Sequence, residues 1–145
     1  MLEQLVDYTH ILPFTRKGDL YRLIQEAHQA KVGTVCLNEG KIAEAQRYLW
    51  DLKSEVQLSA VIAFPFGERS SYAKASDVRT ALMLGAKEVE VVTNMGLLRE
   101  KNKADFTYEI TQVLAAVRDT PPLDARYGVK FVVENSYVDR EEIIS

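Results

Sequence analysis

The stretch LSAVIAF, residues 58–64, decides the fold class, because it is apolar at every position except Ser59. An apolar run of this length is typical of a strand that is buried on both faces in a parallel sheet. The sequence FPFG at residues 64–67 ends the run abruptly. Residues 58–64 therefore predict a buried strand of a parallel α/β protein.

Further strand-like runs lie on both sides of this stretch, with helical patterns between them. The additional predicted strands are residues 5–9, 34–37, 88–93 and 128–134. This alternation predicts parallel βα units, which close into an eight-stranded barrel or form an open doubly wound sheet. A complete barrel needs roughly 200 residues or more. The 145 residues stop inside an expected helix at 139–145, so they predict the front part of a single domain.

Composition and charge narrow the class of protein. An apolar fraction of 47% is ordinary for a globular domain, and no apolar run approaches the roughly 18 residues of a membrane span. The net charge of −3 gives no reason to expect nucleic acid or a membrane as a partner. The single cysteine, Cys36, excludes an internal disulfide and a cysteine-based zinc site. Since no signal peptide is recognisable, we expect a cytoplasmic protein.

Residues at the ends of the predicted strands are the candidates for substrate binding, because ligands of parallel α/β proteins bind beyond the carboxyl ends of the strands. These candidates are Asp7, Thr9, Cys36, Asn38 and Glu134. The two histidines, His10 and His28, show no metal-ligand spacing, and the chain has no glycine-rich phosphate loop. We therefore expect no metal at the site.

Glu90 and Lys130 are the most informative charged residues, because each interrupts an otherwise apolar strand. A charge in a buried strand is costly unless it is paired. The strand period of two directs both side chains away from their valine neighbours. We predict that they share the inner face of the sheet within salt-bridge reach, where such a pair can move protons. They are the candidate catalytic residues, and a structural ion pair is the alternative interpretation.

Five segments of the chain carry a family resemblance. They read DYT and LP at residues 7–9 and 12–13, TVCLN at 34–38, VIAFPFG at 61–67, GAKEVEVVTNMG at 85–96 and VKFVVEN at 129–135. Each segment is weak evidence by itself. Together, and in this order, they resemble the strand motifs of the deoxyribose-phosphate aldolases across nearly all of the chain.

The resemblance implies a TIM-type (β/α)₈ barrel, of which residues 1–145 form the N-terminal part with five strands and four helices. It implies reversible cleavage of 2-deoxyribose 5-phosphate to glyceraldehyde 3-phosphate and acetaldehyde, through a Schiff base on a lysine and without a cofactor. In the family this lysine ends the sixth strand, so we expect the chain alone to be inactive. Its partner in a complete barrel would be a small phosphorylated sugar or aldehyde.

Glu90 departs from the family pattern, which has an aspartate at this position. In the family that aspartate works in proton transfer with a lysine, which Lys130 matches, and with water. Glutamate keeps the charge but adds one methylene, and a displacement of about 1 Å can cost roughly a hundredfold in rate. Two alternatives stay open: a non-catalytic half-barrel that acts as a binding or assembly module, and an unrelated barrel lyase or isomerase.

A five-stranded piece of a barrel is also expected to leave apolar side chains uncovered on its inner face. The residues predicted there are Val6, Val35, Val61 and Val91, or their neighbours. Each apolar Å² left in water forgoes about 25 cal/mol, and open strand edges recruit other strands. We therefore expect self-association. The alternative is an inner face that is made polar by Asp7, Asn38 and Glu90.

Overall fold

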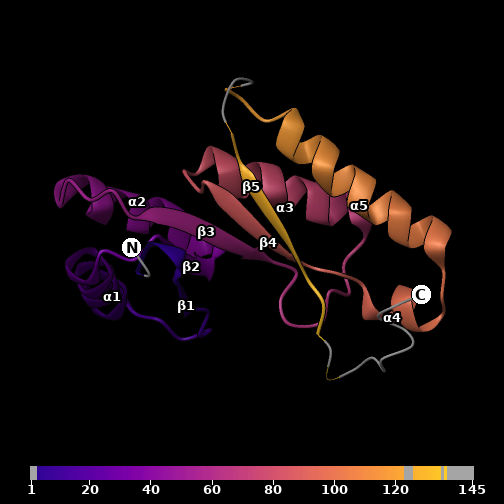
Figure 1. Cartoon of the computed structure of the whole chain (residues 1–145), viewed down its shortest axis with the longest axis horizontal. Coiled ribbons are helices and arrows are strands. Elements are labelled where there is room, and N and C mark those ends of the chain that lie inside the picture. Colours follow the sequence, from indigo (N-terminus) through magenta and orange to yellow (C-terminus); the bar gives the residue numbers. More distant parts are fainter. Residues whose placement is uncertain (1–2, 123–125, 135, 137–145) are drawn as a thin grey trace.

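The computed structural model describes residues 3–122, 126–134 and 136. Within these residues, strands and helices alternate along the chain (Figure 1). The strands are β1 (Asp7–His10), β2 (Thr34–Asn38), β3 (Gln57–Ile62), β4 (Glu88–Val92) and β5 (Gly128–Val132). The longer helices are α1 (Lys17–Ala30), α2 (Ile42–Asp51), α3 (Ser71–Met83) and α5 (Lys103–Arg118), and the shorter ones are η1 (Glu3–Leu5), η2 (Glu39–Lys41) and α4 (Met95–Arg99).

The five strands form one parallel sheet whose spatial order is the chain order, β1-β2-β3-β4-β5. An open doubly wound sheet reverses its strand order at a switch point and carries helices on both faces. Here α1, α2, α3 and α5 contribute to a single core on one face of the sheet. The predicted class, part of a parallel β/α barrel, is confirmed.

The hydrophobic core lies between the sheet and its helices. Side chains alternate between the two faces of a strand, and those that point toward the helices are almost all apolar. The core residues of the strands are Val35, Leu37, Leu58, Ala60, Ile62, Val89 and Val91, and they pack against helix residues such as Leu20, Ile24, Leu49, Val78 and Val113. Helical spacing in the sequence therefore identifies the faces that are buried.

The inner face of the sheet is formed by the alternate strand residues, whose side chains point away from the helices, and it is largely polar. Val35 and Val91 belong to the helix-facing core. The expectation that they line the inner face is therefore wrong, and it is their neighbours in the strands that point inward. Val61 does lie on the inner face, but it is buried in a small cluster with Cys36 and Val92. The alternative expectation, a polar inner face, is therefore the one that agrees with the structure.

The sheet is strongly curved, as shown by a contact between its two outermost strands across the inner face. Lys130 Nζ in β5 donates a hydrogen bond of 2.5 Å to Asp7 Oδ2 in β1, although β2, β3 and β4 lie between them in the sheet. In an eight-stranded barrel the first and fifth strands lie on opposite sides, and the interior is just wide enough for side chains to fill. The curvature is that of a half-closed barrel.

Local hydrogen bonds and backbone conformations determine where the helices around β4 begin and end. Ser70 caps α3 by accepting a hydrogen bond from the Ala73 backbone N–H, and Gly85 follows the helix with a φ of 115°. The short helix α4 follows β4, and the Asn94 side chain caps it by accepting a hydrogen bond from the Leu97 backbone N–H. The helix expected at residues 139–145 lies outside the described residues. Within the described part of the chain, none of the helices has the length and apolarity needed to cross a bilayer.

Candidate active site

A cluster of charged side chains occupies the inner face of the sheet, and Lys130 is at its centre. The Lys130 ammonium bonds to Asp7, the first residue of β1, and lies 2.6 Å from Glu88 Oε1, at the first residue of β4. Two carboxylates, one from β1 and one from β4, therefore share one cation. The backbone of β5 alone could not hold Lys130 in this place, so the position depends on the curvature of the sheet.

These two carboxylates set the protonation state of Lys130. Partial burial by itself would lower the pKa of the Lys130 ammonium, but the interactions with Asp7 and Glu88 outweigh this effect and raise the pKa well above its usual range. A lysine with a raised pKa remains an ammonium ion at neutral pH. Lys130 can therefore donate hydrogen bonds as an ammonium ion, but it does not present the free amine that imine formation requires.

Glu90 lies on the same face as Lys130, because the two residues are register partners in β4 and β5. The predicted common face is confirmed, but the ionic partners differ from the prediction. Lys130 pairs with Asp7 and Glu88, whereas Glu90 Oε1 accepts a hydrogen bond of 3.0 Å from Ser59 Oγ in β3. Glu90 is therefore held by a neutral donor next to the charged pair.

Cys36 lies beside Glu90 and Ser59, and its side chain is fully buried. Burial raises the pKa of the Cys36 thiol far above its usual range, and the neighbouring charge of Glu90 raises it further. A thiol in this state is not a nucleophile at neutral pH. Cys36 therefore acts as a small apolar side chain that fills the inner face.

Asp7, Glu88 and Glu90 bring their carboxylate oxygens within 4.8 Å of one another, a spacing that could suit a bound cation. In this arrangement the single Lys130 ammonium is shared by two of the three carboxylates, those of Asp7 and Glu88, and neutralises one negative charge. The cluster thus has an internal counter-ion, the Lys130 ammonium, which occupies the position between Asp7 and Glu88.

The remaining predicted substrate-binding residues are not part of this cluster. Thr9 is exposed in β1 and its hydroxyl contacts the Asp7 carbonyl, while Asn38 is half-buried at the last residue of β2. Glu134 lies beyond β5 and accepts hydrogen bonds from the Ser136 hydroxyl and backbone N–H, which lower its pKa. Asp7 opens β1 rather than ending it. The charged cluster therefore lies within the sheet and not at its carboxyl edge.

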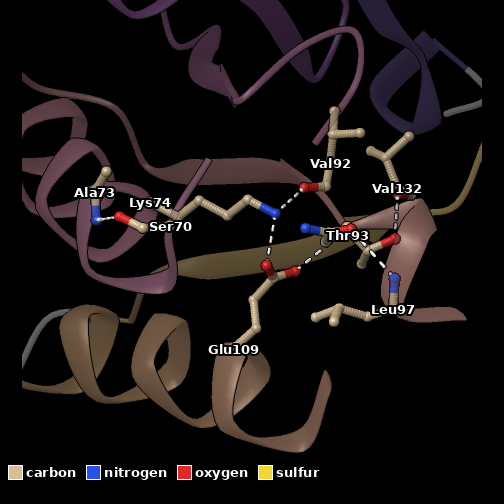
Figure 2. Close-up of polar contacts among 9 residues, drawn as sticks. Ser70, Ala73, Lys74, Val92, Thr93, Leu97, Glu109 and Val132 are labelled. Carbon is tan, nitrogen blue, oxygen red and sulfur yellow. Dashed lines mark hydrogen bonds and ion pairs between the residues drawn. The ribbon is translucent and has the colours of Figure 1, made fainter. Parts of the chain in front are cut away.

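Sequence reasoning missed a second, fully buried charge pair, which Figure 2 shows. Lys74 of α3 donates to Glu109 Oε2 of α5 at 2.8 Å and to the Val92 carbonyl, the last of β4, at 2.9 Å. The other oxygen of Glu109 accepts from the Asn94 backbone N–H at 3.1 Å. Burial lowers the pKa of Lys74, and the charge of Glu109 opposes this shift. The pair ties two helices to the carboxyl end of β4.

Next to this buried pair, hydrogen bonds join the carboxyl ends of β4 and β5. The Thr93 backbone N–H and its hydroxyl both donate to the Val132 carbonyl at 3.1 Å (Figure 2). Thr93 is also the residue against which Gly67, in the loop after β3, is packed. Three consecutive strand exits are therefore held together at the edge where ligands of parallel barrels bind.

The fold and the inner-face cluster define part of a parallel β/α-barrel protein, and the comparisons with known proteins agree. Curated deoxyribose-phosphate aldolases from Thermococcus gammatolerans and Dictyoglomus turgidum are 31% and 34% identical to the chain over 143 residues. Each match covers 99% of this chain and 61% of the relative. The chain spans about three fifths of the length of these relatives. No family model matches the chain.

Solved structures give the same result. A Coccidioides immitis crystal structure, provisionally described as a deoxyribose-phosphate aldolase, matches with a TM-score of 0.88 and 28% identity, over 99% of this chain and 53% of that one. A tetrameric Aeropyrum pernix deoxyribose phosphate aldolase matches in fold, with a TM-score of 0.82 and 22% identity over 98% and 56% of the two chains. The chain is therefore a relative of the deoxyribose-phosphate aldolases, and it corresponds to a part of them.

Proposed function

We propose that this chain supplies the proton-handling part of an aldolase site that acts on a small phosphorylated sugar or aldehyde. The observation that carries the proposal is the inner-face cluster, in which Lys130 and the three carboxylates of Asp7, Glu88 and Glu90 come from three strands. Retro-aldol cleavage through a Schiff base needs groups that add and remove protons, and carboxylates and ammonium ions are suited to this task. No cofactor is needed.

The proposed roles of the individual residues follow from their contacts in the cluster. Lys130 acts as a charged hydrogen-bond donor, because its carboxylate neighbours raise its pKa and keep it as an ammonium ion. Glu90 is the candidate base, because Ser59 holds one of its oxygens without neutralising the charge. Asp7 and Glu88 position Lys130. Thr9, Cys36, Asn38 and Glu134 remain proposed substrate-binding residues, with Cys36 contributing only an apolar surface.

The chain by itself is proposed to lack retro-aldol activity, because Lys130 is held as an ammonium and cannot form the imine. We expect no adduct when the chain is incubated with 2-deoxyribose 5-phosphate and borohydride, and no release of acetaldehyde. Mass spectrometry detects the adduct, and the full-length Thermococcus gammatolerans relative serves as the positive control. An imine on Lys130 together with turnover would contradict this assignment.

A chimaera tests the proposed role of Glu90 directly. It joins this chain to the part of the Thermococcus gammatolerans relative that the chain does not cover. If the chimaera is an aldolase, we expect Glu90→Gln to lower kcat by about 10²–10⁴-fold, the usual contribution of a general acid or base. Glu55→Gln, at an exposed site outside the cluster, is the matched control. Equal activity of the two variants would exclude Glu90 from proton transfer.

A non-catalytic assembly module is the second candidate function, and the internal ion pairing of the cluster favours it. The two short contacts of Lys130 pair its ammonium with Asp7 and Glu88 within the chain, without a ligand. In either case we expect the isolated chain to self-associate, because the outer edges of β1 and β5 are unpaired within the described residues and open edges recruit other strands. An inactive but folded chimaera would favour the module.

A further inference from the structure

Ser59 is the single polar residue of the apolar run at residues 58–64. Its side chain is fully buried, and the cost of burying a hydroxyl is offset only when the hydroxyl makes a hydrogen bond. An apolar side chain, like that of its neighbour Ala60, would occupy a buried strand position without this cost. The hydroxyl of Ser59 therefore requires a specific partner.

The partner of Ser59 is Glu90, on the neighbouring strand β4. Ser59 Oγ donates a hydrogen bond of 3.0 Å to Glu90 Oε1. The two residues are not opposite each other in the sheet, because the register partner of Ser59 is Glu88, and Glu90 lies two positions further along β4. Diagonal neighbours on one face of a sheet are within reach of long side chains. The Glu90 carboxylate therefore extends diagonally, back toward the start of the strand, to meet the hydroxyl.

This contact depends on the length of the Glu90 side chain. An aspartate, which the family pattern has at this position, is shorter by one carbon–carbon bond, about 1.5 Å. On the same backbone, its oxygens would lie beyond the hydrogen-bond range of Ser59 Oγ. The extra methylene of Glu90 and the hydroxyl of Ser59 therefore match each other.

The other neighbours of the pair make Ser59 the donor on which Glu90 depends. Cys36 is the register partner of Ser59 on the β2 side, and a thiol is only a weak hydrogen-bond donor. Lys130 is the register partner of Glu90, but its ammonium is held by other carboxylates. A hydroxyl fixes the Glu90 carboxylate and leaves its negative charge in place, whereas an ammonium would neutralise it.

We propose that Ser59 is a positioning residue for Glu90, a role that rests on the proposed function of Glu90 as a base. The Ser59 hydroxyl holds one carboxylate oxygen at a fixed place on the inner face, and the other oxygen is then the one that accepts a proton. Glutamate has one more rotatable side-chain bond than aspartate, and the contact with Ser59 removes the freedom that this bond adds. Ser59 acts through Glu90 and makes no contact with the substrate.

Carbon-13 relaxation of the glutamate side chains tests this role in the isolated chain, without any need for activity. We expect the Glu90 side chain to be rigid in the parent chain. In Ser59→Ala it should become as mobile as the exposed Glu55. Thr120→Ala is the matched control, because it removes another buried hydroxyl, one that donates to the Ala116 carbonyl. This control should leave the relaxation of Glu90 unchanged.

The chimaera tests whether the position of Glu90 matters for catalysis. We expect Ser59→Ala to lower kcat by about 10–100-fold with little change in KM, the range for a misplacement of about 1 Å or the loss of a hydrogen bond to a charged group. Ser59→Thr, which keeps the hydroxyl, should restore most of kcat. When Glu90 is replaced by the shorter aspartate (Glu90→Asp), Ser59→Ala should lower kcat no further.

Two outcomes would overturn the positioning role. They are a Glu90 side chain that is equally mobile in the parent chain and in Ser59→Ala, and an equal loss of kcat from Ser59→Ala with Glu90 and with Glu90→Asp. If the chimaera is inactive, the relaxation measurement alone decides. A rigid Glu90 that Ser59→Ala loosens, in a chimaera that Glu90→Gln does not slow, would count against the proposed base and not against the positioning. Thermal unfolding shows that each variant is folded.

Discussion

We expect Lys74→Met to lower the free energy of unfolding by about 3–5 kcal/mol, the usual loss when one partner of a buried ion pair is removed. Methionine has nearly the length of the lysine stem, so packing is largely kept, and the loss comes from charge. Glu109 would be left as a buried carboxylate without its cation, and the Val92 carbonyl would lose its donor. Urea denaturation measures the change.

An exposed pair on the same protein provides the control. Arg118 and Asp119 form an ion pair of 2.7 Å in which both side chains are more than half exposed. Water screens exposed pairs, which contribute little to stability, so we expect Arg118→Met to change the free energy of unfolding far less than Lys74→Met does. If Lys74→Met were as mild as Arg118→Met, water would have to reach Glu109, and the buried network of Figure 2 would not exist in solution.

The double variant Lys74→Met/Glu109→Gln separates the charge interaction from the other contacts. Removing both charges leaves no isolated ion. The double variant should therefore lose less free energy of unfolding than the two single variants lose in sum. Residues that contact each other in a cycle of this kind typically show coupling of about 0.5–3 kcal/mol. Additive losses would indicate that Lys74 and Glu109 stabilise the protein independently, each through its backbone partner.

The sequence was sufficient to predict the elements of the fold, because periodicity is a local property. The apolar run at residues 58–64 gave β3, and the alternation of strands and helices gave the parallel sheet. The interruption of two apolar strands by Glu90 and Lys130 was enough to place both on the inner face. Val35 and Val91 were assigned to the wrong face, because their neighbours Cys36 and Glu90 point inward and adjacent side chains of a strand lie on opposite faces.

The partners of Lys130 could not be predicted from the same signals. Asp7 and Lys130 are 123 positions apart, and their contact depends on how strongly the whole sheet curves. No local sequence pattern predicts that curvature. Glu88 was passed over because, at a strand start, a glutamate is usually solvated.

Lys74 was missed because a single lysine in an amphipathic helix normally lies on the solvent side. One signal could have identified it. Lys74 stands four residues before Val78 and seven before Ala81, so it occupies the apolar face of α3. A long cation on such a face requires a buried partner, which Glu109 supplies from the apolar side of α5.

We also expect Gly67→Ala to lower the free energy of unfolding by about 2–5 kcal/mol. Gly67 has a φ of 68°, a left-handed conformation that costs other residues about 1–2 kcal/mol. A Cβ at this position would lie 2.0 Å from the Thr93 carbonyl oxygen, and relieving such overpacking costs about 1–3 kcal/mol more. The obstacle is backbone, so no side-chain rotation can remove the clash.

The strain of Gly67→Ala would act on the carboxyl edge of the sheet. Thr93 can retreat from a new Cβ only by loosening its two hydrogen bonds to the Val132 carbonyl. We therefore expect faster hydrogen exchange at Thr93 in addition to the loss of stability. Gly40→Ala is the matched control, because a Cβ at Gly40 meets no atom within 4 Å and its φ is not in the left-handed region. Equal stability of the two variants would mean that the loop after β3 does not pack on Thr93 in solution, and the three strand exits would then be free to move independently.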